Sequence, residues 1–200
     1  VNDDRALEAM VEVPRENFVP EEFRGVAFAD TEIPLPNGRT IPAPKLEAKM
    51  LQALEIKPED NILVIGTGNG YLTACLAKLG RQVTGIDPDD DAVASATARL
   101  EELGIRNVSL SVASPKDKIP KGEFDAILVA ASMAGWDERC AEYEQQLSVG
   151  GRLFVVIGQA PAMEAGVVTK TGENEWRYAA LFETELEPFD KTPAAESFNF

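Results

Sequence analysis

One stretch near the middle of the chain constrains the fold more than any other. A short apolar run over residues 62–65 is followed by a loop with three glycines at 66, 68 and 70, and then by a predicted helix over Tyr71–Leu79. A continuous apolar run of this length is typical of a strand that is buried on both faces. A buried strand that passes through glycines into a helix indicates a parallel α/β sheet with a ligand site at the strand's carboxyl end.

The same alternation of strand and helix continues along the chain. Further strands are predicted at 82–87, 108–112, 125–130 and 153–158, and helices at 89–103 and 137–147. Repeated βα units with apolar strands predict a doubly wound, mostly parallel sheet with helices on both faces. Residues 165–169 and 176–185 form two further predicted strands around a Thr-Gly-Glu-Asn turn, which indicates an antiparallel carboxyl-terminal hairpin at one edge.

The first 57 residues lack this alternation of strands and helices. Helical spacing predicts a helix over 3–13, a short helix after Pro20 and a third helix over 45–54. Between them, residues 30–44 are rich in proline and glycine and predict an extended, turn-rich loop of a functional kind. A chain of 200 residues fits one hydrophobic core, so we expect one domain with an amino-terminal helical cap.

Composition excludes several classes of function. The net charge of −15 would repel a phosphate backbone, so no nucleic-acid partner is expected. The chain has no histidine, which removes histidine-dependent nucleophile systems and the commonest metal ligand, and no metal site is predicted. Cys75 and Cys140 lack a CxxC spacing and are interpreted as buried thiols in a reducing compartment.

The sequence also bears on where the protein is located. No apolar run is long enough to span a bilayer, and the start does not resemble a signal peptide. We therefore expect a cytoplasmic protein without a membrane partner, and a monomer in preference to an oligomer. The first residue is Val1, from which we expect that preceding residues, an initiator methionine included, are missing from this sequence.

The glycine loop and an acid after the next strand predict a nucleoside-cofactor site. Asp87 ends the strand that follows the loop, so both lie at carboxyl ends of neighbouring strands, where ligands bind in such sheets. Glycines admit a ligand close to the backbone, and a carboxylate at Asp87 can accept from both ribose hydroxyls. Tyr71 stands where the dinucleotide fingerprint requires a small residue, which disfavours a pyrophosphate ligand.

The G-x-G-x-G form of the loop, with the antiparallel carboxyl-terminal hairpin, resembles the Rossmann-like S-adenosylmethionine methyltransferases. Longer motifs resemble the protein-L-isoaspartate O-methyltransferase family over nearly the whole chain. They are Val-Pro-Arg-Glu-Asn-Phe-Val-Pro (13–20), Ala-Phe-Ala-Asp (27–30), Gly-Arg-Thr-Ile-Pro-Ala-Pro (38–44), Ile-Gly-Thr-Gly-Asn-Gly-Tyr (65–71), Phe-Asp-Ala-Ile (124–127) and Gly-Gly-Arg-Leu (150–153).

The resemblance implies a seven-stranded sheet, S-adenosylmethionine as cofactor with S-adenosylhomocysteine as product, and methyl transfer to L-isoaspartyl residues of damaged proteins. It divides the single domain, residues 1–200, into a helical cap with a substrate loop over 1–57 and a cofactor-binding core over 58–190. The carboxylate acceptor is already ionised at neutral pH, so the chemistry needs no general base.

Particular residues are expected to carry these roles. The cofactor-binding residues are Ile65, Gly66, Thr67, Gly68, Asn69, Gly70, Asp87, Pro88 and Ser114. The expected catalytic residues are Thr40 and Ile41, and the substrate-binding residues are Arg39 and Lys45, whose positive charges suit a carboxylate.

Three positions depart from the family pattern. Arg39 replaces a glutamine, Pro42 replaces a hydroxyl-bearing serine of the substrate loop, and Ser114 replaces an acid expected to meet the adenine amino group. These changes keep two alternatives open: a divergent homologue that binds S-adenosylmethionine with little or no isoaspartyl methylation, and a methyltransferase for another small carboxylate. A nucleobase methyltransferase is disfavoured, since its Asn/Asp-Pro-Pro-aromatic turn is lacking and Trp136 is expected to pack on the helix that follows it.

Overall fold

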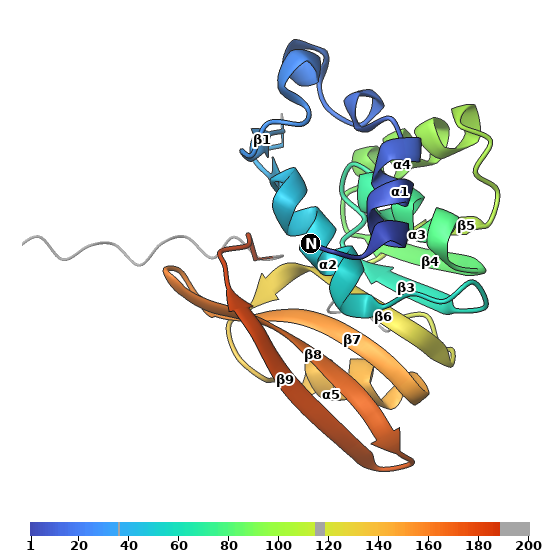
Figure 1. Cartoon of the computed structure of the whole chain (residues 1–200), viewed down its shortest axis with the longest axis vertical. Helices are drawn as coiled ribbons and strands as arrows, with labels where there is room; N and C mark the ends of the chain where they lie inside the picture. Colours follow the sequence, from blue (N-terminus) through green and yellow to red (C-terminus); the bar gives the residue numbers. More distant parts are fainter. Residues whose placement is uncertain (36, 115–118, 189–200) are drawn as a thin grey trace, which may run out of the picture.

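The computed structural model describes residues 1–35, 37–114 and 119–188. Its centre is a seven-stranded sheet of order β5-β4-β3-β6-β7-β8-β9 (Figure 1), which confirms the predicted fold class. Neighbouring strands from β5 through to β7 pair in parallel, and β7, β8 and β9 pair antiparallel. The strands are β3 (Asn61–Ile65), β4 (Gln82–Asp87), β5 (Val108–Val112), β6 (Phe124–Met133), β7 (Leu147–Gln159), β8 (Ala162–Gly172) and β9 (Glu175–Glu183).

Local sequence accounts for where most helices begin. The side chains of Asp3, Asp89 and Asp137 each accept a hydrogen bond from the first turn of the helix that follows, as helix-capping acids do. Pro44 opens another helix at its first position, where a missing N–H costs nothing. The helices are α1 (Asp4–Glu12), α2 (Pro44–Leu54), α3 (Tyr71–Leu79), α4 (Asp90–Glu102), α5 (Glu138–Gln145) and the 3₁₀ helices η1 (Arg15–Asn17) and η2 (Glu21–Val26).

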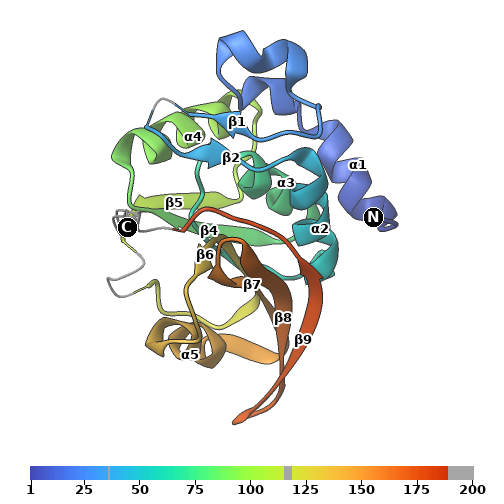
Figure 2. The same ribbon diagram turned by 90° about the vertical axis from the view of Figure 1, so that its left-hand side faces the viewer.

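The sheet is covered on both faces, and β3 shows how. Ile62 and Val64 point into a core formed with α1, α2 and α3, whereas Leu63 and Ile65 point into a core formed with α5. In Figure 2, α5 lies away from the group formed by α1, α2 and α3, with strands of the sheet between them. Because successive side chains of a strand face opposite ways, a strand buried on both faces must be apolar throughout.

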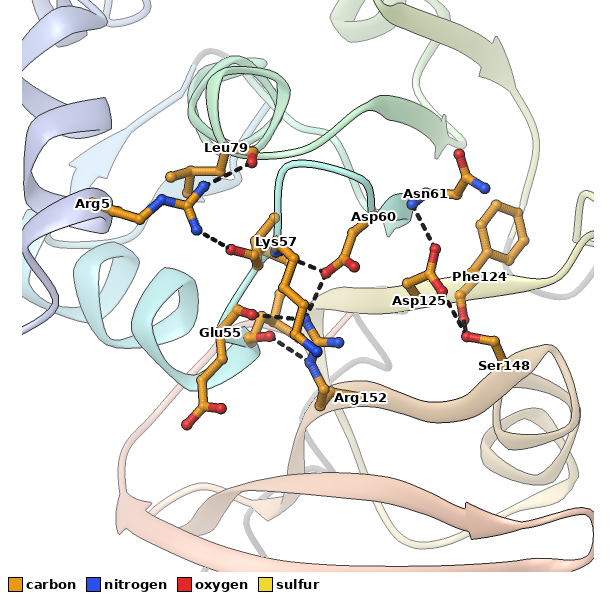
Figure 3. A network of polar contacts seen from close by, with 12 residues as sticks. Arg5, Glu55, Lys57, Asp60, Asn61, Leu79, Phe124, Asp125, Ser148 and Arg152 are labelled. Atoms are coloured by element: carbon orange, nitrogen blue, oxygen red, sulfur yellow. Dashed lines mark hydrogen bonds and ion pairs between the residues drawn. The ribbon is translucent and has the colours of Figure 1, made fainter.

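A polar network closes the amino ends of the strands (Figure 3). Arg152 donates from Nε to the Leu54 carbonyl and from Nη2 to the Asp60 carboxylate, both at 2.7 Å. Arg5 of α1 donates to the Ile56 carbonyl at 2.6 Å. These contacts fix the helical cap to the sheet at the end opposite the glycine loop.

The proline-rich loop contains more order than the sequence indicates. Within it, β1 (Ile33–Pro34) and β2 (Thr40–Ile41) pair antiparallel, with Ile33 opposite Ile41. Two-residue strands leave no periodic pattern in a sequence, so the predicted extended, turn-rich loop agrees with the structure, whereas the pairing of β1 with β2 was not predicted. Strands β6, β7 and β8 are also longer than predicted, because pairing with their neighbours extends them beyond their apolar cores.

Other predictions concern single residues and ends. Cys75 and Cys140 are buried free thiols, as expected. Trp136, which is expected to pack on the following helix, is 46% exposed and meets the Tyr178 ring edge-on at 5.9 Å. The end of the predicted core at 189–190 and the final segment, 192–200, lie outside the described residues. Within the described part of the chain, no helix has the length and apolar content needed to cross a membrane.

Candidate functional site

The glycine loop between β3 and α3 has a backbone that only glycine adopts easily. Gly66, Gly68 and Gly70 have φ angles of 86°, 52° and 90°, in the left-handed region that other residues avoid. A Cβ on Gly70 would lie 2.8 Å from the Cβ of Ala96, so α4 packs directly on the loop. Around Gly68, by contrast, a Cβ would meet nothing within 4 Å. The outer side of the loop is therefore open to a ligand.

Asp87 lies directly behind this loop at the end of β4 and is fully buried. Its carboxylate accepts from the Gly68 amide at 2.8 Å and from the Asp89 amide at 3.0 Å. It also accepts from Nη1 of Arg39, at 3.1 Å to Oδ1 and 3.4 Å to Oδ2. Asp87, which is predicted to hold a ribose, thus also fixes the glycine loop and pairs with the Arg39 guanidinium of the proline-rich loop.

Three polar contacts hold the proline-rich loop against the sheet's carboxyl edge. Besides the Arg39–Asp87 pair, the Asn37 side chain donates to Asp89 at 2.6 Å, and the Thr40 amide donates to Oε2 of Glu187 at 2.9 Å. The hydrogen bond from Asn37 is the main reason that the pKa of Asp89 lies below its usual value. The loop is therefore anchored to the acids that surround the glycine loop.

Two cavities border the facing loops. The smaller, of about 50 Å³, is lined by Leu35, Arg39, Thr40, Ile41, Pro42, Glu47, Gly66, Thr67, Gly68, Asn69, Leu72, Ala130, Leu186, Glu187 and Pro188. The larger, of about 610 Å³, is lined by Phe18, Pro20, Leu35, Asn37, Arg39, Gly68, Asn69, Asp89, Asp91, Ala92, Ser95 and Arg99. The larger one has the size of ordinary small-molecule sites. Leu35, Arg39, Gly68 and Asn69 line both cavities.

Thr67 supplies an independent sign that a polar ligand belongs here. Its Oγ1 is buried and has no hydrogen-bond partner among the described residues. Buried hydroxyls are normally satisfied, and exceptions mark places where a ligand or water completes the bonding. Thr67 lines the smaller cavity in the glycine loop, so a group that enters there can complete this bonding.

A buried ion pair supports the proline-rich loop from below. Arg15 and Glu47 are 0% and 1% exposed, and Nε of Arg15 donates to Oε2 of Glu47 at 2.8 Å. The same guanidinium donates to the carbonyls of Pro42, at 2.8 Å, and of Ala27, and lies 5.5 Å from the centre of the Tyr71 ring. Arg15 thereby connects the helical cap, the proline-rich loop and the start of α3.

Burial raises the pKa of Glu47 to about 7, against the opposing effect of Arg15. Between about pH 4.5 and 7 the folded protein therefore binds more protons at this site than the unfolded chain does, so stability falls as the pH rises. As the pH rises through this window, we expect the free energy of unfolding of the wild-type protein to fall by up to about 3 kcal/mol more than that of Glu47→Gln, which has no titrating group at this position. Urea denaturation of both proteins at several pH values measures this difference, and parallel pH profiles would contradict the expectation.

The structure brings most of the predicted site residues together. Those that line the smaller cavity are Arg39, Thr40, Ile41, Gly66, Thr67, Gly68 and Asn69. Ile65 ends β3 just before the glycine loop, Gly70 is the last residue of the loop, and Asp87 lies behind it. Pro88 and Ser114 line neither cavity, although the adjacent Ala113 amide donates to the Asp87 carbonyl at 3.0 Å. Their roles stay predictions.

Lys45, predicted to bind the substrate, lies away from both cavities. Its side chain is 68% exposed and its ammonium lies 3.9 Å from Asp30. It lines neither cavity, because the start of α2 turns it outward. Conversely, sequence reasoning missed Glu47 and Glu187, which both line the smaller cavity. For Glu47, the sequence did offer a signal, because a charged residue stands at a helix position that faces the core. No local signal marked Glu187.

Fold and site together define the class of protein. The sheet has seven mostly parallel strands and ends in an antiparallel hairpin, with a glycine loop after β3 and a buried acid at the end of β4. This is the arrangement of a Rossmann-like methyltransferase. The chain belongs to the protein-L-isoaspartate(D-aspartate) O-methyltransferase family, whose model matches residues 1–188.

Curated relatives agree with this membership, and a solved structure has the same fold. A protein-L-isoaspartate O-methyltransferase of Paracoccus denitrificans is 36% identical over 189 residues, covering 94% of this chain and 86% of that protein. One from Proteus mirabilis is 37% identical, covering 82% and 77% of the two chains. A Plasmodium falciparum structure described as a member of this family in complex with S-adenosyl-L-homocysteine superposes with a TM-score of 0.81 at 24% identity, covering 96% of this chain and 93% of that one.

Proposed function

We propose that this protein transfers the methyl group of S-adenosylmethionine to the side-chain carboxylate of L-isoaspartyl residues in damaged proteins. The observation that carries the proposal is the meeting of two loops over one buried acid: residues 39–42 face the glycine loop, with Asp87 behind it. Family membership over residues 1–188 supports the acceptor and the cofactor.

The residues present fit such a cofactor. Gly68 leaves room for a ligand beside the backbone, Asp87 offers a buried carboxylate at the place of the ribose hydroxyls, and Thr67 has an unsatisfied hydroxyl. When bound, S-adenosylmethionine supplies a methyl group on a positively charged sulfur, which a carboxylate can displace directly. The residues of the glycine loop would hold its adenosine and amino-acid portions.

This chain's own contribution to the reaction is placement. Carboxyl groups have pKa values near 4, so the acceptor is ionised at neutral pH and no side chain has to remove a proton. Residues 39–42 orient the acceptor, and Leu35, Ile41 and Leu186 line the smaller cavity with apolar surface that excludes water. Holding two reactants in line contributes up to about 7–11 kcal/mol to catalysis in favourable cases.

A direct assay tests the proposal. The protein is incubated with labelled S-adenosylmethionine and an isoaspartyl peptide, and beside it with the matching aspartyl peptide. Label that enters only the isoaspartyl peptide as a base-labile ester is the expected result. Label in neither peptide, with S-adenosylhomocysteine still bound in calorimetry, would favour the alternative of a cofactor-binding homologue without this activity. Labelled small carboxylic acids would favour another acceptor.

The alternative of a cofactor-binding homologue with little or no isoaspartyl methylation has specific structural support. Pro42 can donate neither a hydroxyl nor an N–H to an acceptor, and the Arg39 guanidinium is held by Asp87. Both features reduce the donors that residues 39–42 offer to a carboxylate. We therefore expect slow turnover of isoaspartyl peptides, because residues 39–42 offer few donors to the acceptor carboxylate.

Arg39 also bears on cofactor affinity. Asp87 already accepts from two amides and from this guanidinium, which together use the acceptor capacity of a carboxylate. Ribose hydroxyls must displace Arg39, and an ion pair of this partial exposure contributes up to about 1 kcal/mol. We expect Arg39→Gln, which restores the family's glutamine, to tighten S-adenosylhomocysteine binding about threefold to fivefold. Calorimetry measures this, and weaker binding would show that Arg39 helps to hold the cofactor.

The setting of the protein is proposed on sequence grounds. We propose a cytoplasmic monomer that acts as one domain, with residues 1–57 forming the cap and substrate loop and 58–190 the cofactor-binding core. Its net charge of −15 disfavours nucleic acid as a partner. Size-exclusion chromatography with light scattering tests the monomeric state.

A further inference from the structure

The segment after β9 brings a carboxylate of this chain into the smaller cavity. Glu187 follows Leu186, which is buried at 7% exposure. The Ser132 amide donates to the Glu187 carbonyl at 2.9 Å, and Ser132 pairs with Pro188 in an isolated parallel bridge. The backbone at Glu187 is therefore fixed to the carboxyl end of β6, next to the site.

The side chain of Glu187 binds the loop that is to orient the acceptor. Its Oε2 accepts from the Thr40 amide at 2.9 Å, across 147 positions of sequence. The neighbouring donors of this loop are engaged elsewhere: the Arg39 amide donates to Oδ1 of Asn37, its guanidinium pairs with Asp87, and Pro42 has no N–H. At the cavity, Thr40 offers two neutral donors, its amide and its hydroxyl, and a carboxylate already holds the amide.

The group that Glu187 places on the Thr40 amide is a carboxylate, and the acceptor of the methyl group is a carboxylate too. Given the proposed function, on which this step rests, an isoaspartyl carboxylate entering the smaller cavity needs donors from residues 39–42. We infer that Glu187 occupies the acceptor-carboxylate subsite and competes with the substrate, so that it determines how tightly isoaspartyl peptides bind. An incoming carboxylate has to displace Glu187 from the Thr40 amide before it can take its place.

Charge around the subsite acts in the same direction. Burial, together with the negative charges of Glu187 and Glu185, raises the pKa of Glu32. The charge of Glu187 thus acts on another carboxylate of this chain, and a further carboxylate brought next to Glu187 by the substrate is repelled in the same way. Glu185 is exposed and two residues from Glu187, so it separates the effect of charge from that of the hydrogen bond.

The test compares Glu187→Ala with the matched control Glu185→Ala, which removes the same charge without touching Thr40. A fluorescent isoaspartyl peptide is titrated into each protein saturated with S-adenosylhomocysteine, and KM and kcat for methylation are measured separately. We expect Glu187→Ala to lower the peptide Kd and KM about tenfold with little change in kcat, and Glu185→Ala to change them less than about twofold. Glu187→Gln, which keeps the size of the side chain, should fall between wild type and Glu187→Ala.

Each other outcome is decisive. Unchanged peptide affinity in Glu187→Ala, while the wild type methylates the peptide, overturns this inference and leaves the proposed function standing. Equal gains in the two alanine variants also overturn it, in favour of general repulsion. If neither the wild type nor Glu187→Ala binds or methylates the peptide, both the inference and the proposed function fail. S-adenosylhomocysteine affinity equal to that of the wild type verifies that each variant is folded.

Discussion

Replacing Arg15 by alanine is expected to lower the free energy of unfolding by about 3–5 kcal/mol, the usual effect of removing one partner from a buried ion pair. The substitution leaves the Glu47 carboxylate buried and also removes donors to the carbonyls of Pro42 and Ala27. The helical cap and the proline-rich loop would lose their shared anchor. Urea denaturation followed by circular dichroism measures the change.

A double variant separates the pair's own contribution from the penalty of a lone buried charge. Arg15→Met combined with Glu47→Leu removes both charges while keeping apolar volume, and replacements of this kind are often neutral or stabilising. We expect it to recover most of the stability that Arg15→Ala loses. An Arg15→Ala protein within about 1 kcal/mol of wild type would show that Glu47 takes up a proton or is reached by water, and that the pair is not a structural anchor.

Changing Asp87 to asparagine is expected to weaken S-adenosylhomocysteine binding about tenfold to a hundredfold, since hydrogen bonds to a charged group contribute about 1.5–3 kcal/mol. The carboxylate both offers acceptors to the ribose hydroxyls and fixes the Gly68 amide at 2.8 Å. An asparagine retains the shape and loses the charge and one acceptor. Isothermal titration calorimetry gives the two dissociation constants.

Asp91→Asn is the matched control for this experiment. Asp91 lines the larger cavity near the same loop and is exposed, so its change should alter affinity less than about threefold, in line with screening by solvent. Equal losses in the two variants would mean that overall charge, and not the position behind the glycine loop, governs binding. Unchanged affinity in Asp87→Asn would remove Asp87 from the site.

Membership of the family does not by itself predict how this chain uses its loop. Lys45 is an example: its positive charge suits a carboxylate, yet its side chain lies outward beside Asp30. Which face of a helix meets the cavity depends on how the helix is docked. The buried residues of α2 set that docking, and they turn Glu47 inward and Lys45 outward.

Local sequence determined the elements of the sheet and the position of the cofactor loop. Apolar strands of continuous character, capping acids before helices and glycines at positive φ each act within a few residues, so their signals can be read from neighbouring positions. Parallel strands also end at one edge, which is why the sequence alone is enough to place the glycine loop and Asp87 together.

Only the tertiary structure decided which charged groups meet at the site. Arg15 pairs with Glu47 over 32 positions, Arg39 with Asp87 over 48, and Thr40 with Glu187 over 147. Partners at such separations have no shared periodicity, because their contact depends on how whole elements pack and not on local backbone preference. The sequence shows that these polar groups exist. The packing of the cap, and of the segment after β9, against the sheet decides whether each group faces a ligand, a partner or solvent.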